Sequence, residues 1–227
     1  AEYALEFGGT RHVILPDSAD ITLPSTGWTI VVSIDIPSND SAADYTVLDI
    51  KDGSFLKDWV RLWIGGSSLG NTWNRNRINC NHRAETTSTS EVTSPTLSLP
   101  YAEYLTVFAR YDGSGTISTG YCAADGSISV GSAAKTLGNI NGKEWYIGCK
   151  TEADSPLETG TTIKQLGIWA SSISNAAIEA IAAGSALSNI SGCIREYLFN
   201  EGAGVSLADN LGAGSTDGTF INPPGDD

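Results

Sequence analysis

The chain has 227 residues, and its 26 acidic against 13 basic side chains give a formal net charge of -13 at pH 7. This charge argues against binding to nucleic acid or anionic membranes, and no apolar run reaches the ~18 residues of a membrane span. The 25 glycines and 8 prolines favour short strands joined by turns, which we expect to form one domain over residues 1–222, with a flexible tail over 223–227.

Alternating apolar residues predict β-strands along most of the chain, most clearly at residues 28–36, 59–64, 104–111 and 163–169. Regular alternation in residues 163–169 would place Ile163 and Gln165 on one face of the strand, and Lys164 and Leu166 on the other. Residues 65–95 form a long polar stretch that we expect to hold a short strand plus a loop. We expect residues 195–199 to be the last strong strand. Three tryptophans are expected in the core: Trp28, Trp145 and Trp169.

Residues 174–183 form the one convincing helix of the sequence. Ser174 suits an N-cap and Gly184 suits the helix end. Ile178 and Ile181 fall on one side, so the helix has a single apolar face. A helix this short and rich in alanine needs a sheet to pack on.

The four cysteines show no C-x-x-C spacing, which argues against a zinc site. We expect them to be small buried thiols, and one or two disulfides are the alternative. They are Cys80, Cys122, Cys149 and Cys193.

Several segments, in order, resemble the laminin G-like, concanavalin A-like jelly-roll family. They are ALEFGG at 4–9, WTI at 28–30, YDGSG at 111–115, the strand and helix at 163–183, and the segment at 196–218. The resemblance implies an all-β, two-sheet antiparallel jelly-roll sandwich with one short helix near 174–183, and it does not fix a function. In many members the last segment precedes the opening strand. In this chain the segment at 196–218 comes after the others, so it would either shift the order of the strands along the chain or complete the sheet from the other end.

Some proteins that share this fold are glycoside hydrolases or polysaccharide lyases. Hydrolases need two carboxylates across the scissile bond, and the E-x-D-x-x-E array of the family is missing. A lyase would carry a Gln-x-His motif, which neither His12 nor His82 matches. We therefore expect no catalysis, with a polysaccharide lyase or hydrolase as the remaining alternative.

The glycine- and aspartate-rich turn near the C-terminus is the candidate metal site. Asp209, Asn210 and Asp217 could supply oxygen ligands for Ca2+. The alternative is a set of Asx turns that bind no metal.

Two groups of alternating tryptophan and arginine residues are the candidate binding site. Indoles stack on sugars or anchor protein interfaces, and arginine forks onto carboxylates or sulfates. A structural role under the 65–95 loop or within the sandwich, a protein interface and a glycan site all remain open. The residues are Trp59, Arg61, Trp63, Trp73, Arg75 and Arg77.

The leading hypothesis is a non-catalytic structural or adhesive module, because the resemblance extends to phage capsid decoration and tail proteins. It would lie at a virion surface or outside the cell, as a homo-oligomer in contact with other protein subunits. No signal peptide is visible at the start of the sequence. The alternative is a carbohydrate-binding module that recognises surface or extracellular glycans.

Overall fold

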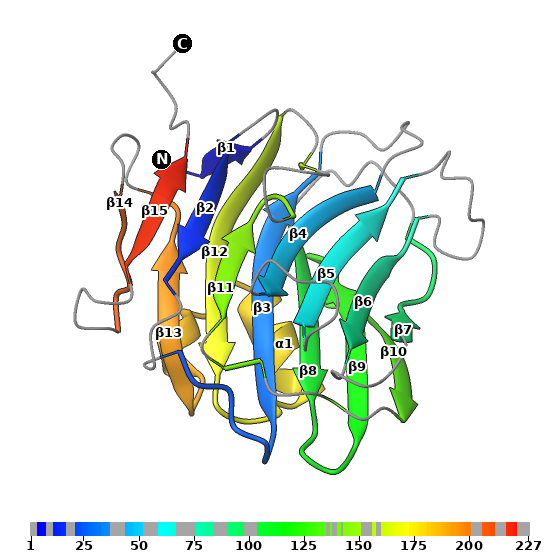
Figure 1. The fold of residues 1–227 in the computed structure, drawn as a ribbon. Helices are drawn as coiled ribbons and strands as arrows, with labels where there is room; N and C mark the ends of the chain where they lie inside the picture. Colours follow the sequence, from blue (N-terminus) through cyan, green and yellow to red (C-terminus); the bar gives the residue numbers. More distant parts are fainter. Residues whose placement is uncertain are drawn as a thin grey trace.

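A computed structural model describes residues 4–7, 11–16, 21–36, 44–51, 59–66, 76–83, 90–97, 104–134, 137, 140–141, 143–150, 156–157, 160–200, 206–211 and 217–221. Two antiparallel sheets pack face to face, and one helix lies against the outer side of one of them (Figure 1). The predicted two-sheet jelly-roll sandwich is thus confirmed. In the described part of the chain, no helix has the length and apolar character needed to span a membrane.

The first sheet carries the helix on its outer face and has the strand order β1-β12-β3-β8-β9-β10, with β13 paired to β12 outside this path. We call it the helix-bearing sheet. Its strands are β1 (Leu5–Phe7), β3 (Trp28–Asp35), β8 (Leu105–Tyr111), β9 (Thr116–Cys122), β10 (Ile128–Ala134), β12 (Thr161–Trp169) and β13 (Cys193–Leu198).

The second sheet, which we call the opposite sheet, has the order β14-β15-β2-β11-β4-β5-β6-β7. Its strands are β2 (His12–Leu15), β4 (Asp44–Lys51), β5 (Trp59–Gly65), β6 (Ile78–Arg83), β7 (Ser90–Thr93), β11 (Glu144–Ile147), β14 (Ser206–Leu207) and β15 (Gly218–Ile221).

The main core lies between the two sheets and is built from alternate residues of each strand. Ile30 and Val32 of β3 meet Val60 and Leu62 of β5 in this layer. All four are fully buried, and such burial is the main favourable term in folding. Trp28 and Trp145 belong to the same layer, as predicted.

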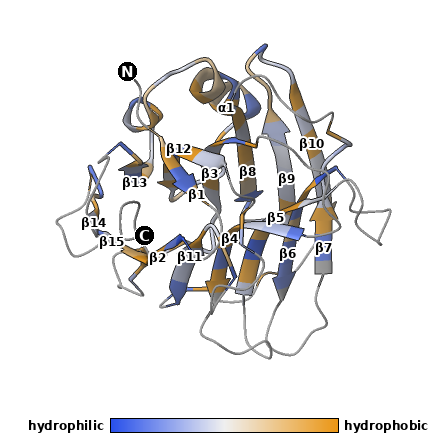
Figure 2. Ribbon diagram, turned by 90° about the horizontal axis from the view of Figure 1, so that it is seen from above, coloured by the Kyte–Doolittle hydropathy of each residue, from blue (hydrophilic) through white to orange (hydrophobic). Residues whose placement is uncertain are grey.

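Helix α1 (Asn175–Ala182) covers a second apolar cluster on the outer face of the helix-bearing sheet (Figure 2). Ile178 and Ile181 pack there beside Phe108 and Trp169. The hydroxyl of Ser174 accepts a hydrogen bond from the Ala177 N–H at 3.2 Å, which confirms the predicted N-cap. Trp169 is therefore buried as predicted, but under the helix rather than between the sheets.

Strand β12 departs from the regular alternation predicted for residues 163–169. A bulge shifts its register with β3 between Ile163 and Gln165. Ile163 and Leu166 both join the main core, so the two residues between them face outward together. The prediction was wrong because a bulge inserts one extra residue into a strand and resets its alternation.

One other prediction about strands needs correction: the described part of the polar stretch 65–95 holds two strands, β6 and β7, rather than one. Strand β13 lies where the last strong strand was predicted, and two short strands follow it, of which β15 pairs with β2. The segment at 196–218 therefore serves both sheets: β13 pairs with β12, while β14 and β15 extend the opposite sheet.

None of the four cysteines forms a disulfide. Cys80, Cys122 and Cys149 are buried thiols, as predicted, and Cys193 is partly buried.

Candidate binding site

The predicted Trp-Arg-Trp group lies on the outward face of β5. Val60, Leu62 and Ile64 point into the core, so period-2 geometry turns Trp59, Arg61 and Trp63 away from it. Their exposed fractions are only 4%, 8% and 5%. Trp73 and Arg75 lie outside the described residues. At these exposures the two indoles do not form an open stacking platform.

The polar groups of this face are largely engaged with each other. Arg61 Nε and Nη2 donate to the two carboxylate oxygens of the buried Asp49, at 3.2 and 3.4 Å. The guanidinium carbon also lies 5.3 Å from the centre of the Trp59 ring. Trp63 Nε1 donates to Asn81 Oδ1 at 2.7 Å. Fork-shaped pairing of this kind orients both partners.

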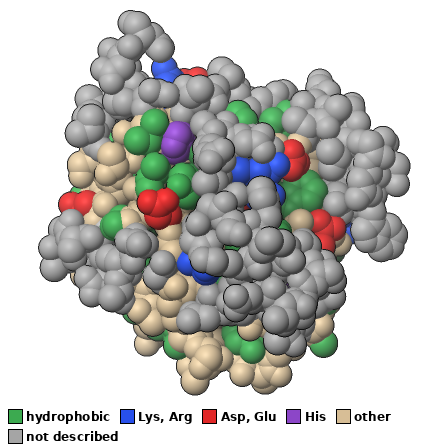
Figure 3. Space-filling view, viewed as in Figure 1, with side chains coloured by type: hydrophobic (Ala, Val, Ile, Leu, Met, Phe, Trp, Pro, Cys, Tyr) green, Lys and Arg blue, Asp and Glu red, His purple; other side chains and the backbone are tan. Residues whose placement is uncertain are grey.

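Trp59 Nε1 is different, because it is buried and has no hydrogen-bond partner in the described structure. On the visible face of the molecule, basic side chains lie in small groups beside acidic ones rather than in one basic patch (Figure 3).

Arg77 lies just before β6, and its Nη1 donates to the Ser94 carbonyl at 2.6 Å. This bond ties the entrance of β6 to the end of β7. Arg77, like Arg61, is therefore engaged in a contact within the fold.

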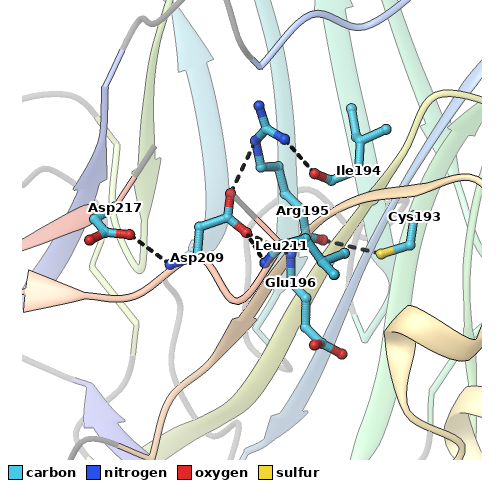
Figure 4. Close-up of polar contacts among 7 residues, drawn as sticks. All are labelled: Cys193, Ile194, Arg195, Glu196, Asp209, Leu211 and Asp217. Atoms are coloured by element: carbon cyan, nitrogen blue, oxygen red, sulfur yellow. Dashed lines mark hydrogen bonds and ion pairs between the residues drawn. The ribbon is translucent and has the colours of Figure 1, made fainter. Parts of the chain in front are cut away.

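The predicted calcium turn is held by hydrogen bonds and one ion pair (Figure 4). Asp209 Oδ1 accepts from the N–H groups of Glu196 and Leu211, and Asp209 Oδ2 lies 3.1 Å from Arg195 Nε. Asp217 Oδ1 accepts from the Asp209 N–H at 2.9 Å.

The main-chain N–H of Asn210 donates to the Glu196 carbonyl, so this part of the turn is fastened to β13. Among the described residues, no group of three or more His, Cys, Asp or Glu side chains is placed to hold a metal ion. Calcium binding by Asp209, Asn210 and Asp217 stays a prediction.

A cavity of about 420 Å³ lies at one end of the sandwich, with Leu23, Trp28 and Ile140 in its wall. Asn141 Oδ1 there accepts from the Leu23 N–H at 2.7 Å. Its wall combines apolar side chains with those of Ser25, Tyr111 and Asn141.

A second cavity, of about 300 Å³, opens on the outer face of the helix-bearing sheet, beside the C-terminal end of α1. We call it the helix-side pocket. Its floor is a row of side chains across three paired strands: Gln165 of β12, Ser33 of β3 and Thr106 of β8. All three side chains line the cavity although they are at least nine-tenths buried.

The floor of the helix-side pocket retains hydrogen-bonding capacity. Gln165 Nε2 donates to Ser33 Oγ at 3.0 Å. The amide oxygen and the second N–H of Gln165 remain for other hydrogen bonds. Thr106 also lines the cavity, although its residue is only 2% exposed, and its hydroxyl can both donate and accept. A hydrogen bond from a polar ligand to this hydroxyl would contribute about 1 kcal/mol.

The end of the pocket away from the helix is formed by Lys164 and Tyr104. The ammonium of Lys164 lies 5.9 Å from the centre of the Tyr104 ring. The Tyr104 hydroxyl is 2.9 Å from Thr162 Oγ1, so the ring is tied to β12. The carbonyl of Lys164 accepts from the Phe199 N–H at 3.0 Å, which fixes the bulge against β13.

The opposite end is formed by α1 and the turn that follows it. Ile181 and Ala182 line the cavity from the last turn of the helix. Glu196 lies on the β13 side, and its Oε1 accepts from the Ser188 N–H at 3.1 Å. This contact holds the turn after the helix over the sheet.

Reasoning from sequence missed this pocket because it assumed regular alternation in β12. Without the bulge, Lys164 and Gln165 would point to opposite faces. The adjacent polar pair Lys-Gln in a central strand is the available signal, because regular alternation would turn one of the two toward the core and a bulge lets both face outward.

Hydrolysis of a glycosidic bond needs two carboxylates on either side of the bond. Of the described residues that line the helix-side pocket, Glu196 is the one carboxylate. The pocket thus offers groups for binding and orientation, rather than an acid–base pair.

No protein-family model and no curated protein matches this sequence. Solved structures do match. A putative carbohydrate binding protein from Bacteroides ovatus superposes with a TM-score of 0.63 at 16% identity, covering 96% of this chain. The chain spans 57% of the length of that structure.

Two further structures are similar at lower scores. Tailspike protein 2 of a bacteriophage of Escherichia coli O157:H7 has a TM-score of 0.55 at 11% identity, over 83% of this chain and 25% of the tailspike. The CBM40 of the Ruminococcus gnavus IT-sialidase, bound to alpha2,3 sialyllactose, has a TM-score of 0.54 at 13% identity, over 80% of this chain and 96% of the module. At these identities the similarity shows the fold alone, and that fold is the concanavalin A-like jelly roll.

Proposed function

We propose that this chain is a non-catalytic carbohydrate-binding module and that the helix-side pocket receives the sugar. The observation that carries the proposal is the pocket floor, where Thr106 and Gln165 present hydrogen-bonding atoms at buried positions. A preformed cavity with a few fixed polar groups is typical of a small-molecule site.

The similar structures support a binding role. One is described as a putative carbohydrate binding protein and another was solved with a sialylated sugar. The single carboxylate of the pocket supports a role without catalysis.

The test compares glycan binding by the wild-type protein and by Thr106→Val, on a printed array of mono- and oligosaccharides and then by calorimetry. Valine preserves the shape of threonine and removes the hydroxyl alone. Because a neutral hydrogen bond contributes about 1 kcal/mol, we expect the affinity for the best array ligand to fall about fivefold.

Thr46→Val is the matched control. Thr46 is similarly buried, its hydroxyl has no partner in the described structure, and it lies on the opposite sheet, away from the pocket. We expect this variant to bind like the wild type. Equal losses in both variants, or no binding to any glycan on the array, would contradict the proposal.

A subunit of a virion surface is the second candidate function, as a decoration or tail component acting through protein contacts. The similarity to a phage tailspike favours it. Analytical ultracentrifugation of the purified protein tests this candidate. A stable oligomer would support it, and a monomer at all concentrations would count against it.

A further inference from the structure

We infer that the helix-side pocket takes one neutral sugar ring, presented end-on as the terminal residue of a glycan, rather than an internal stretch of chain. This inference rests on the proposed function and adds the class of ligand to it. It depends on the dimensions of the pocket, the residues at its two ends and its charge.

Along the strand direction, Tyr104 and Lys164 line one end of the pocket and the last turn of α1 lines the other. Along β8 and the residue just before it, Tyr104 lies at the outer end of the pocket, Thr106 in its floor and Phe108 under the helix. With ~3.4 Å of rise per residue, Tyr104 and Phe108 lie about 14 Å apart between their Cα atoms. The Tyr104 ring and the end of α1 occupy part of this length, so about one six-membered ring fits between them.

The volume of the pocket leads to the same size of ligand. Its 300 Å³ lies at the lower limit of the ~300–1,000 Å³ that ligand sites span. A bound chain of several sugars needs an open groove with two exits. Here Lys164 with Tyr104 lines one end, and Ile181 with the turn after the helix lines the other, so we infer that a longer chain would not run through the pocket.

The polar groups suit a neutral ring with many hydroxyls. Ser33 and Thr106 offer hydroxyls, and Gln165 offers both an amide oxygen and an amide N–H. Ile181 and Leu198 offer apolar contact for ring C–H groups.

The charges of the pocket balance each other, since Lys164 contributes one ammonium and Glu196 one carboxylate. Each has a contact already, the ammonium on the Tyr104 ring and the carboxylate at the Ser188 N–H. An acidic sugar would bring a second negative charge close to Glu196, so the pocket favours a neutral ligand.

The experiment measures affinity by calorimetry against two series of probes. The first consists of the methyl glycosides of glucose, galactose and mannose, with the di- and tetrasaccharides that end in the sugar that binds best. The second compares that sugar with its uronic acid and with sialyllactose.

We expect the methyl glycoside to bind within about threefold of the tetrasaccharide, and the acidic sugars to bind at least tenfold more weakly. Ser185→Trp, which places an indole at a position lining the cavity, should abolish binding of the glycoside. Ser127→Trp, on the exposed turn after Asp125, is its control and should bind normally.

An affinity that rises more than tenfold from one sugar to four would overturn end-on binding, and a preference for the acidic sugars would overturn the neutral ligand. In both cases an affinity that still falls about fivefold in Thr106→Val would leave the proposed function standing. Absence of binding to every glycan would overturn the proposed function together with this inference.

Discussion

Two separate variants, Trp63→Phe and Trp59→Phe, test how much the indole N–H groups on the outward face of β5 contribute to stability. Both changes remove the same ring atoms from sites of equal burial, so the loss of packing is similar. They differ in the N–H group. Trp63 donates to Asn81 at 2.7 Å, whereas Trp59 Nε1 is buried without a partner in the described structure.

The expected difference follows from this contrast. Trp63→Phe loses a hydrogen bond and leaves an acceptor partly buried, which costs about 1–2 kcal/mol beyond the packing loss. Trp59→Phe removes an unsatisfied donor and so relieves about 1–2 kcal/mol, less about 0.5 kcal/mol of weakened cation–π contact with Arg61. We expect Trp63→Phe to be about 2 kcal/mol less stable than Trp59→Phe.

Urea unfolding followed by tryptophan fluorescence measures the difference, provided that the two variants share one slope m. A Trp59 variant as unstable as the Trp63 variant would refute the reasoning. It would mean that the Trp59 N–H has a partner in solution that the structure does not show.

Three further predictions concern the turn and a thiol. Asp209→Asn should lower the free energy of unfolding by about 3 kcal/mol, because it leaves the guanidinium of Arg195 without its buried partner; a loss below 1 kcal/mol in urea would count against a structural ion pair. If the turn holds calcium, 1 mM Ca2+ should raise the Tm of the wild type and not that of Asp217→Asn, and an unchanged Tm in the wild type would reject the calcium hypothesis. Burial raises the pKa of Cys80 to about 12, against about 8.5 in an unfolded chain. Stability is therefore full below pH 8.5 and falls above it by up to about 1.4 kcal/mol per pH unit, and Cys80→Ala should flatten this fall in urea titrations at pH 8–11.

Local pattern was enough to predict the core strands and the helix. The alternation around Ile30 and Ile34 and the cap at Ser174 depend on near neighbours in sequence, and the structure shows both. The outward turn of Trp59, Arg61 and Trp63 also followed from period-2 geometry.

The features that failed are those that depend on distant partners. The bulge at Lys164 is defined by the register of β12 against β3, and no property of residues 163–169 alone sets that register. Strand β15 has only four residues, too few for alternation to be distinctive, and it becomes a strand by pairing with β2. The helix-side pocket needs four strands and the helix end together, so sequence pattern does not reveal it.

The pairing of β2 with β15 and of β1 with β12 has a consequence for the order of folding. β1 and β2 pair with strands far along the sequence, with Leu5 beside Ile163 and Val13 beside Phe220, and the other partner of β2 is β11. During synthesis, β1 and β2 would leave the ribosome long before these partners, with their hydrogen-bonding edges unpaired. Pairs such as β4 with β5 and β8 with β9 can form earlier, so β1 and β2 are the strands whose open edges chaperones or aggregation would meet in that interval.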